Sequence, residues 1–370
     1  MLSLVLRISL TIPFLLATIA EAQTPARPAR SPAEAPAPPS PSPSPAKTGI
    51  DALNGADLQA AISLVQQRYV NPAAVSGAEL NRATLDGLLR RLDGGVVLLP
   101  ARPAATPTPA PFYREIIDGH IGYLRLGDLS RGQLQELDTT LRGFAGKKVD
   151  ALVLDLRGSV EANDYGVAAE FASRFVAKAK PLFSLRGTAG APNRDFVSTQ
   201  NPAYIGFLAV LVDGETAGAT ETLAGVLRQN DKAILIGQAT AGRAVVYTDS
   251  PLPGGSILRI AVAQAILPEQ APRFGEGIEP DLTVALSTQE KDAIFQESLS
   301  KGMAPFVFEA DRPHLNEAAL LAGTNPEIDA SQQRRARAGD KSAQHDAVLQ
   351  RAVDLVTSIE VYEKQPGRPP

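Results

Sequence analysis

The chain has 370 residues, of which 44% are hydrophobic and 21% are charged, and its formal net charge at pH 7 is −4. This balance allows one to three packed domains and offers no broad basic surface for nucleic acid or an anionic membrane. The absence of cysteine excludes disulfide bonds, a thiolate nucleophile and cysteine-ligated zinc. His120, His314 and His345 show no metal-ligand spacing, so we expect no metal and no cofactor.

The first 22 residues have the composition of an export signal. Arg7 precedes an apolar run over residues 8–20, and Ala20-Glu21-Ala22 supplies small residues at the positions of signal cleavage. The run is short for a membrane-spanning helix, which needs about 20 apolar residues. We expect cleavage after Ala22 and a periplasmic or secreted location, with an uncleaved membrane anchor as the alternative.

Two proline-rich segments divide the rest of the chain. Residues 23–50 are dominated by Pro, Ala, Ser and Thr and cannot bury enough apolar area to fold, so they predict a disordered linker. Residues 100–117 predict a second, shorter linker. Between them, residues 51–99 predict an N-terminal helical region, because apolar residues recur at helical spacing over 56–69 and 78–92.

From residue 118 to 286 the pattern alternates between strands and helices. Strands are expected at 120–126, 151–156, 207–212, 233–236 and 256–263, and helices at 131–144, 165–178 and 217–229. Continuous apolar runs such as Val210-Leu211-Val212 are typical of strands that helices cover on both faces, so we predict an α/β core. Residues 287–370 predict a C-terminal helical region with helices at 288–299 and 343–362.

Several segments of this core resemble the C-terminal-processing (tail-specific) serine peptidases in order and spacing. They are Ile121-Gly122-Tyr123-Leu124-Arg125-Leu126, Leu152-Val153-Leu154-Asp155-Leu156-Arg157, Gly237-Gln238-Ala239-Thr240-Ala241-Gly242-Arg243, Pro251-Leu252 with Gly255-Ser256, and Gly277-Ile278-Glu279-Pro280-Asp281. Tyr69-Val70 and the stretch 346–356 resemble the helical regions at the two ends of the family. The resemblance implies a crotonase/ClpP-like peptidase core with N-terminal helices and a C-terminal helix, and protein or peptide tails as partners.

Two departures from the family concern its architecture. The family usually carries a peptide-gating PDZ domain before the core, whereas only the linker at 100–117 stands there, which is too short for a domain. The family's glycine-rich N-P-G-G turn reads Gly158-Ser159-Val160-Glu161-Ala162-Asn163 in this chain. In the family that turn lies beside the active site.

The resemblance also places the family's serine–lysine dyad on this sequence. The nucleophile segment G-S-A-S-A-S-E corresponds to residues 214–221, and alignment on Glu221 puts Gly218 in place of the attacking serine. Arg243 follows 25 residues later, at the family's serine-to-lysine spacing, and Tyr247 replaces a glutamine that orients the lysine. Glycine has no nucleophile, and arginine stays protonated and cannot act as a general base. We therefore expect no intact catalytic residue.

Neighbouring residues offer few replacements. Thr216 and Thr220 flank Gly218, but capping of the helix N-terminus explains both, and Lys232 lies 14 residues beyond Gly218. Ser159, Ser250 and Ser256 have no lysine or histidine close by in sequence.

Four residues remain as a candidate binding set: Arg243, Glu221, Thr216 and Thr220. Arg243 is either an ordinary surface arginine, paired with Glu221 or not, or a cation whose planar guanidinium binds a peptide C-terminal carboxylate.

Three functions follow from this sequence. The first is an exported homologue of the family that is catalytically inactive and binds a protein or peptide tail without cleaving it. The second is an active serine-type peptidase with a rearranged site. The third is an assembly role, in which the N- and C-terminal helices form a homodimer or pair with an active relative. None of the three involves nucleic acid, or the membrane beyond export.

Overall fold

The computed structural model describes residues 50, 53–101, 109–147, 149–188, 193–230, 232–268, 274–307 and 344–363. The expected signal peptide at 1–22, the expected linker at 23–50 apart from Ile50, and residues 102–108 of the second linker lie outside this set. The chain forms two compact units, one ending at Val75 and one beginning at Ser76. Among the described residues, no helix combines the length and apolar character needed to cross a bilayer.

The first unit contains the helix α1 (Gly55–Arg68) and the short 3-10 helix η2 (Pro72–Val75). The side chain of Asn54 caps α1 by accepting a hydrogen bond from the Asp57 N–H. The apolar residues of α1 recur at the predicted helical spacing, but none of its residues is buried. Helix α1 therefore leaves an apolar stripe exposed.

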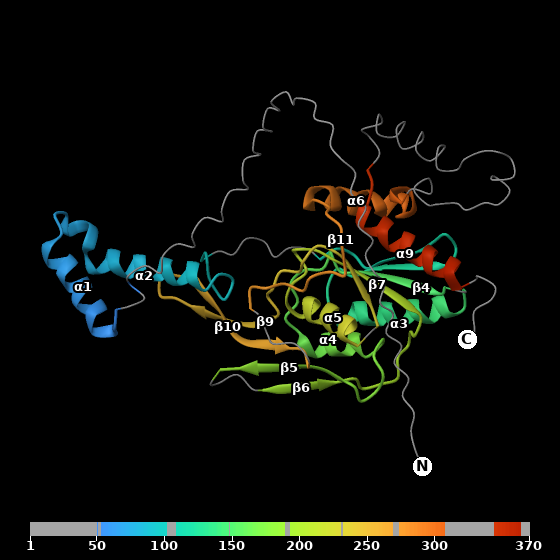
Figure 1. Cartoon of the computed structure of the whole chain (residues 1–370), viewed down its shortest axis with the longest axis horizontal. Helices are drawn as coiled ribbons and strands as arrows, with labels where there is room; N and C mark the ends of the chain where they lie inside the picture. Colours follow the sequence, from blue (N-terminus) through green and yellow to red (C-terminus); the bar gives the residue numbers. More distant parts are fainter. Residues whose placement is uncertain are drawn as a thin grey trace, which may run out of the picture. The chain divides into compact units, whose positions relative to one another are not determined.

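A six-stranded sheet in the order β11-β8-β7-β4-β3-β2 forms the centre of the second unit (Figure 1). The strands are β2 (Tyr113–Ile117), β3 (Ile121–Arg125), β4 (Ala151–Asp155), β7 (Phe207–Val212), β8 (Ile234–Gly237) and β11 (Leu282–Thr283). Neighbouring strands are parallel, except that β2 runs antiparallel to β3. Strand β2 lies in the range expected as a linker, so the core begins earlier than residue 118.

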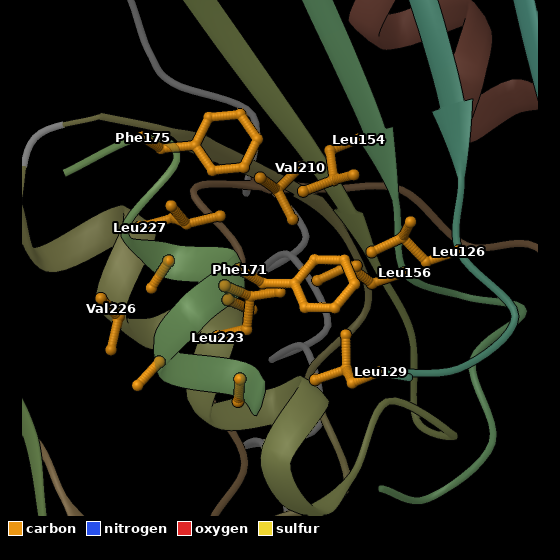
Figure 2. Packing of buried hydrophobic residues seen from close by; sticks show 14 of the residues in the cluster. Leu126, Leu129, Leu154, Leu156, Phe171, Phe175, Val210, Leu223, Val226 and Leu227 are labelled. Atoms are coloured by element: carbon orange, nitrogen blue, oxygen red, sulfur yellow. The ribbon is translucent and has the colours of Figure 1, made fainter. Parts of the chain in front are cut away.

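Helices cover both faces of this sheet, as the apolar runs predicted. The helices are α3 (Arg131–Ala145), α4 (Tyr165–Ala172), α5 (Gly218–Gln229), α6 (Thr288–Lys301), η3 (Ala304–Phe306) and α9 (Ala347–Glu363). Leu152 and Leu154 of β4 pack with α3, α4 and α5, whereas Ala151 and Val153 pack with α6 and α9. Figure 2 shows the first of these clusters, with Leu154 and Val210 of the sheet facing Phe171 of α4. Successive residues of β4 thus face opposite sides of the sheet, as the pleat of a strand requires.

A second sheet is antiparallel, and the sequence predicted only one of its strands. Strand β10 (Ile257–Ile266) pairs with β9 (Val245–Pro251), β1 (Val96–Leu99) and β5 (Pro181–Gly187), and β6 (Arg194–Val197) pairs with β5. Helix α2 (Gly77–Arg91), capped by Ser76, precedes β1. Helix α4 ends at Ala172, six residues before the predicted end, where the Ser173 hydroxyl donates back to the Ala169 carbonyl.

Candidate functional site

The candidate site lies where the parallel strand β7 ends and α5 begins. Ala217 is the N-cap of α5 and no side chain caps this helix, so the capping role predicted for Thr216 and Thr220 is wrong. The Thr216 hydroxyl instead bonds to the Oδ1 of Asp213, and the buried Thr220 hydroxyl has no hydrogen-bond partner among the described residues. Gly218, the first residue of α5, has a φ of 62°. This left-handed conformation is one that glycine adopts without cost.

The first two N–H groups of α5 donate hydrogen bonds to backbone carbonyls. The Ala219 N–H donates to the Ala162 carbonyl at 2.8 Å, and the Gly218 N–H donates to the Arg243 carbonyl at 3.1 Å. A Cβ atom added to Gly218 would lie 2.4 Å from the oxygen of Ala162 and 3.3 Å from the Cγ of Glu161. No real Cβ tolerates the shorter distance, so the native backbone leaves no space for a side chain at position 218.

Glu221 holds the chain segment that carries Arg243. Its carboxylate is buried and accepts hydrogen bonds from the Thr240 hydroxyl at 2.8 Å, the Gly242 N–H at 3.0 Å and the Arg243 N–H at 2.9 Å. Burial raises the pKa of Glu221, and these hydrogen bonds act in the opposite direction. Glu221 therefore contacts Arg243 through the backbone N–H of Arg243, and the role of Glu221 is to position the 240–243 turn.

The guanidinium of Arg243 forms no hydrogen bond or ion pair with any residue that the structure describes. Arg243 is half-buried, and its Cδ would lie 3.3 Å from a Cβ added to Gly94. The Tyr247 hydroxyl donates to the carbonyl of Gly94 at 2.6 Å, and burial raises the pKa of Tyr247. The positions inferred from spacing, 218, 243 and 247, thus converge with Gly94, which sequence reasoning did not identify.

Three of the hydroxyl groups considered as replacement nucleophiles are buried, those of Thr216, Thr220 and Ser159, whereas Ser250 and Ser256 are partly exposed. Thr216 is fully buried, and the buried Ser159 donates its hydroxyl to the Leu126 carbonyl at 3.0 Å. Thr216 and Lys291 of α6 share the carboxylate of Asp213, to which the Lys291 Nζ donates at 2.8 Å, and Lys291 also contacts Glu215. Burial alone would lower the pKa of Lys291, but the charges and hydrogen bonds of Asp213 and Glu215 together outweigh burial, and the pKa is raised. Lys291 is therefore a protonated structural cation.

The loop of residues 158–164, called the site loop below, starts from a buried ion cluster. Arg157 donates to Asp155 at 2.9 and 2.6 Å and to Asp346 of the segment before α9 at 3.0 and 2.8 Å. All three side chains are at most 1% exposed. Burial would raise the pKa of Asp155, but the charge of Arg157, together with the hydrogen bonds from Arg157 and Tyr123, holds the pKa below its usual value. Asp346 lies 189 residues from Arg157, so spacing in the sequence gave no signal for this cluster.

The helices on both faces of the central sheet and the position of the site at a strand-to-helix junction define an α/β core. Residues 120–284, which include positions 218, 243 and 247, match peptidase family S41. The chain therefore carries a peptidase family S41 domain, which confirms the resemblance to C-terminal-processing peptidases inferred from the motifs.

The chain is also similar to several individual proteins. The carboxyl-terminal-processing peptidase 1, chloroplastic, of Arabidopsis thaliana is 28% identical over 187 residues, covering 49% of this chain and 37% of the relative. The carboxy-terminal processing protease CtpB of Bacillus subtilis (strain 168) is 25% identical over 231 residues, covering 58% and 47%. The solved structure of a photosystem II D1 C-terminal processing protease superposes with a TM-score of 0.40 at 22% identity, covering 49% of each chain. The chain spans less than half the length of the two curated relatives.

Proposed function

We propose that the chain is an exported S41 homologue without peptidase activity, which binds the C-terminal tail of a protein or peptide. Gly218 is the main observation in favour of the absence of peptidase activity. Serine–lysine acyl transfer needs a nucleophile, a neutral base and free donors for the oxyanion. Position 218 has no side chain, Arg243 stays protonated, and the Ala219 N–H is bonded to a carbonyl of the chain.

Neither the burial of Thr216 nor the protonated state of Lys291 favours an active peptidase with a rearranged site. Export, to the periplasm or the medium, is inferred from the sequence of residues 1–22 and forms part of the same proposal.

Arg243 supports the binding part of the proposal. A half-buried guanidinium beside Gly94, without an ion pair among the described residues, is suited to an incoming carboxylate. The planar fork of arginine binds a carboxylate with two parallel hydrogen bonds. A peptide C-terminus supplies such a group, and an amidated peptide does not.

The test compares a pool of N-acetylated hexapeptides with free C-termini and the same pool amidated. We expect Arg243→Gln to weaken binding of the free-acid pool by roughly tenfold or more, because a hydrogen bond to a charged group contributes about 1.5–3 kcal/mol. Binding is measured by equilibrium retention on the immobilised full chain. Arg142→Gln, an exposed change on α3, is the matched control and should leave binding unchanged. Equal binding of both pools by the native chain would contradict the carboxylate anchor.

Helix α1 favours a second candidate function, in which the protein assembles with another copy of itself. Leu58, Ile62, Val65 and Tyr69 follow the four-three-four spacing of a helix-pairing seam, and each is at least 37% exposed. If this stripe pairs, Ile62→Glu should shift the chain to monomer in sedimentation analysis. Gln66→Glu adds the same charge without removing an apolar side chain and should not do so. A native chain that stays monomeric at high concentration would exclude this function.

A further inference from the structure

The site loop crosses the N-terminus of α5 in a way that the two dyad substitutions do not require. Its residue Ala162 pairs with Gly218 as an isolated parallel bridge, and its carbonyl accepts the Ala219 N–H. We propose that the site loop is an internal plug, which blocks acyl-transfer chemistry at this site independently of Gly218 and Arg243. The inference deepens the proposed function, because it concerns why the same site is inactive.

The Ala162 carbonyl makes two features of the site unavailable to catalysis. The first is a backbone N–H at the helix N-terminus, the kind of donor that stabilises a developing oxyanion. The second is the volume in which a side chain at position 218 would begin, since the Ala162 oxygen lies 2.4 Å from a Cβ built there. A serine at 218 would have to displace a backbone carbonyl, which cannot move as the end of a flexible side chain can.

Fixed contacts hold the plug in place at both ends. At its start, the Val160 N–H donates to the Gly127 carbonyl at 3.0 Å, and Lys291 of α6 donates to the Arg157 carbonyl at 3.0 Å. A Cβ added to Gly158 would lie 3.0 Å from the Phe295 ring. At its end, the side chain of Asp164 caps α4 by accepting the Val167 N–H at 3.0 Å. The site loop is therefore anchored at both ends by contacts with neighbouring elements.

The middle of the loop is where its course can be changed. Glu161 is exposed, and Ala162 is only partly buried. Glycines at these two positions would allow the peptide group between them and its neighbours to rotate, because glycine adopts both signs of φ. Rotation would turn the Ala162 carbonyl away from α5 and free the Ala219 N–H. The two loop ends would keep their anchors.

The experiment uses four full-length proteins: the native chain, Gly218→Ser/Arg243→Lys, Glu161→Gly/Ala162→Gly, and the variant with all four changes. Each is incubated with a fluorophosphonate probe, and the labelled residue is identified by mass spectrometry. Amide hydrogen exchange at Ala219 is measured in parallel. Circular dichroism establishes that each variant is folded.

We expect labelling at position 218 in the four-change variant at least tenfold faster than in Gly218→Ser/Arg243→Lys. The Ala219 amide should exchange at least tenfold faster in Glu161→Gly/Ala162→Gly than in the native chain, a readout that needs no change at position 218. Equal labelling of both serine variants, or a folded four-change variant that is not labelled, would overturn the plug. So would a native Ala219 amide that exchanges as fast as an exposed one. Labelling of Thr216 or Thr220 in the native chain would overturn both the proposed function and the plug, whereas labelling of a hydroxyl outside this site would overturn the proposed function alone.

Discussion

Replacement of Arg157 by methionine should lower the free energy of unfolding by about 3–5 kcal/mol, because removing one partner of a buried ion cluster leaves uncompensated buried charge. Asp155 and Asp346 are both fully buried and both rely on the Arg157 guanidinium. The Tyr123 hydroxyl, which donates to Asp155 at 2.7 Å, cannot neutralise two carboxylates. The change also removes the ion pair that fastens the start of α9 to the core.

Denaturant unfolding followed by tyrosine fluorescence measures this loss, since the chain contains no tryptophan and Tyr123 lies in the cluster. Arg259→Met is the matched control. Arg259 also makes two hydrogen bonds to one aspartate, Asp249, but their side chains are 36% and 42% exposed. We expect that control to cost under about 1 kcal/mol, as exposed ion pairs do. Equal losses in the two variants would show that burial of the Arg157 cluster does not decide its contribution.

The change Gly218→Ala should destabilise the protein by about 2–4 kcal/mol, because strain from the left-handed backbone adds to overpacking against the site loop. The φ of 62° is one that a residue with a Cβ avoids, and the Ala162 oxygen stands 2.4 Å from the position of that atom. Alanine is the smallest side chain that tests this contact, so polar chemistry does not complicate the result.

Gly143→Ala on α3 is the matched control for this prediction. Nothing lies within 4 Å of a Cβ at position 143, and its φ is not positive. Alanine in a helix interior is favoured over glycine by roughly 0.5–1 kcal/mol, so this control should stabilise the protein. If Gly218→Ala were as stable as the native chain, the site loop could not lie against α5 as described.

Sequence patterns predicted the parts of the fold whose burial is uniform. Strands β4, β7 and β8 are apolar apart from Asp155 at the end of β4 and are covered on both faces, and helices α3 and α5 repeat their apolar residues at helical spacing. Strands β6 and β9 mix exposed charged residues with buried ones, so neither alternation nor a continuous apolar run marked them. Strand β2 was missed because Arg114 and Glu115 follow a proline-rich segment and resembled part of a linker.

In the site, too, the sequence predicted some features, and others depend on contacts between residues far apart in the chain. Gly218 and Arg243, which their spacing in the sequence assigned to one site, are joined by a hydrogen bond between their backbones. Sequence spacing could not show that a carbonyl from Ala162 lies over α5, because a backbone contact leaves no side-chain signature. Nor could it identify Lys291, which approaches Asp213 across 78 positions of chain. Glu221 was predicted to be part of the site, but its partners proved to be the Thr240 hydroxyl and two backbone N–H groups.

The central claim is that the native chain performs no serine-type peptide cleavage, and one assay tests it directly. The full chain is incubated with an unfolded protein substrate beside Thr216→Ala/Thr220→Ala, and cleavage products are followed by mass spectrometry. We predict no cleavage above the substrate-only control in either sample. Cleavage by the native chain that is lost in the threonine variant would contradict the account and would show that a threonine beside Gly218 is the nucleophile.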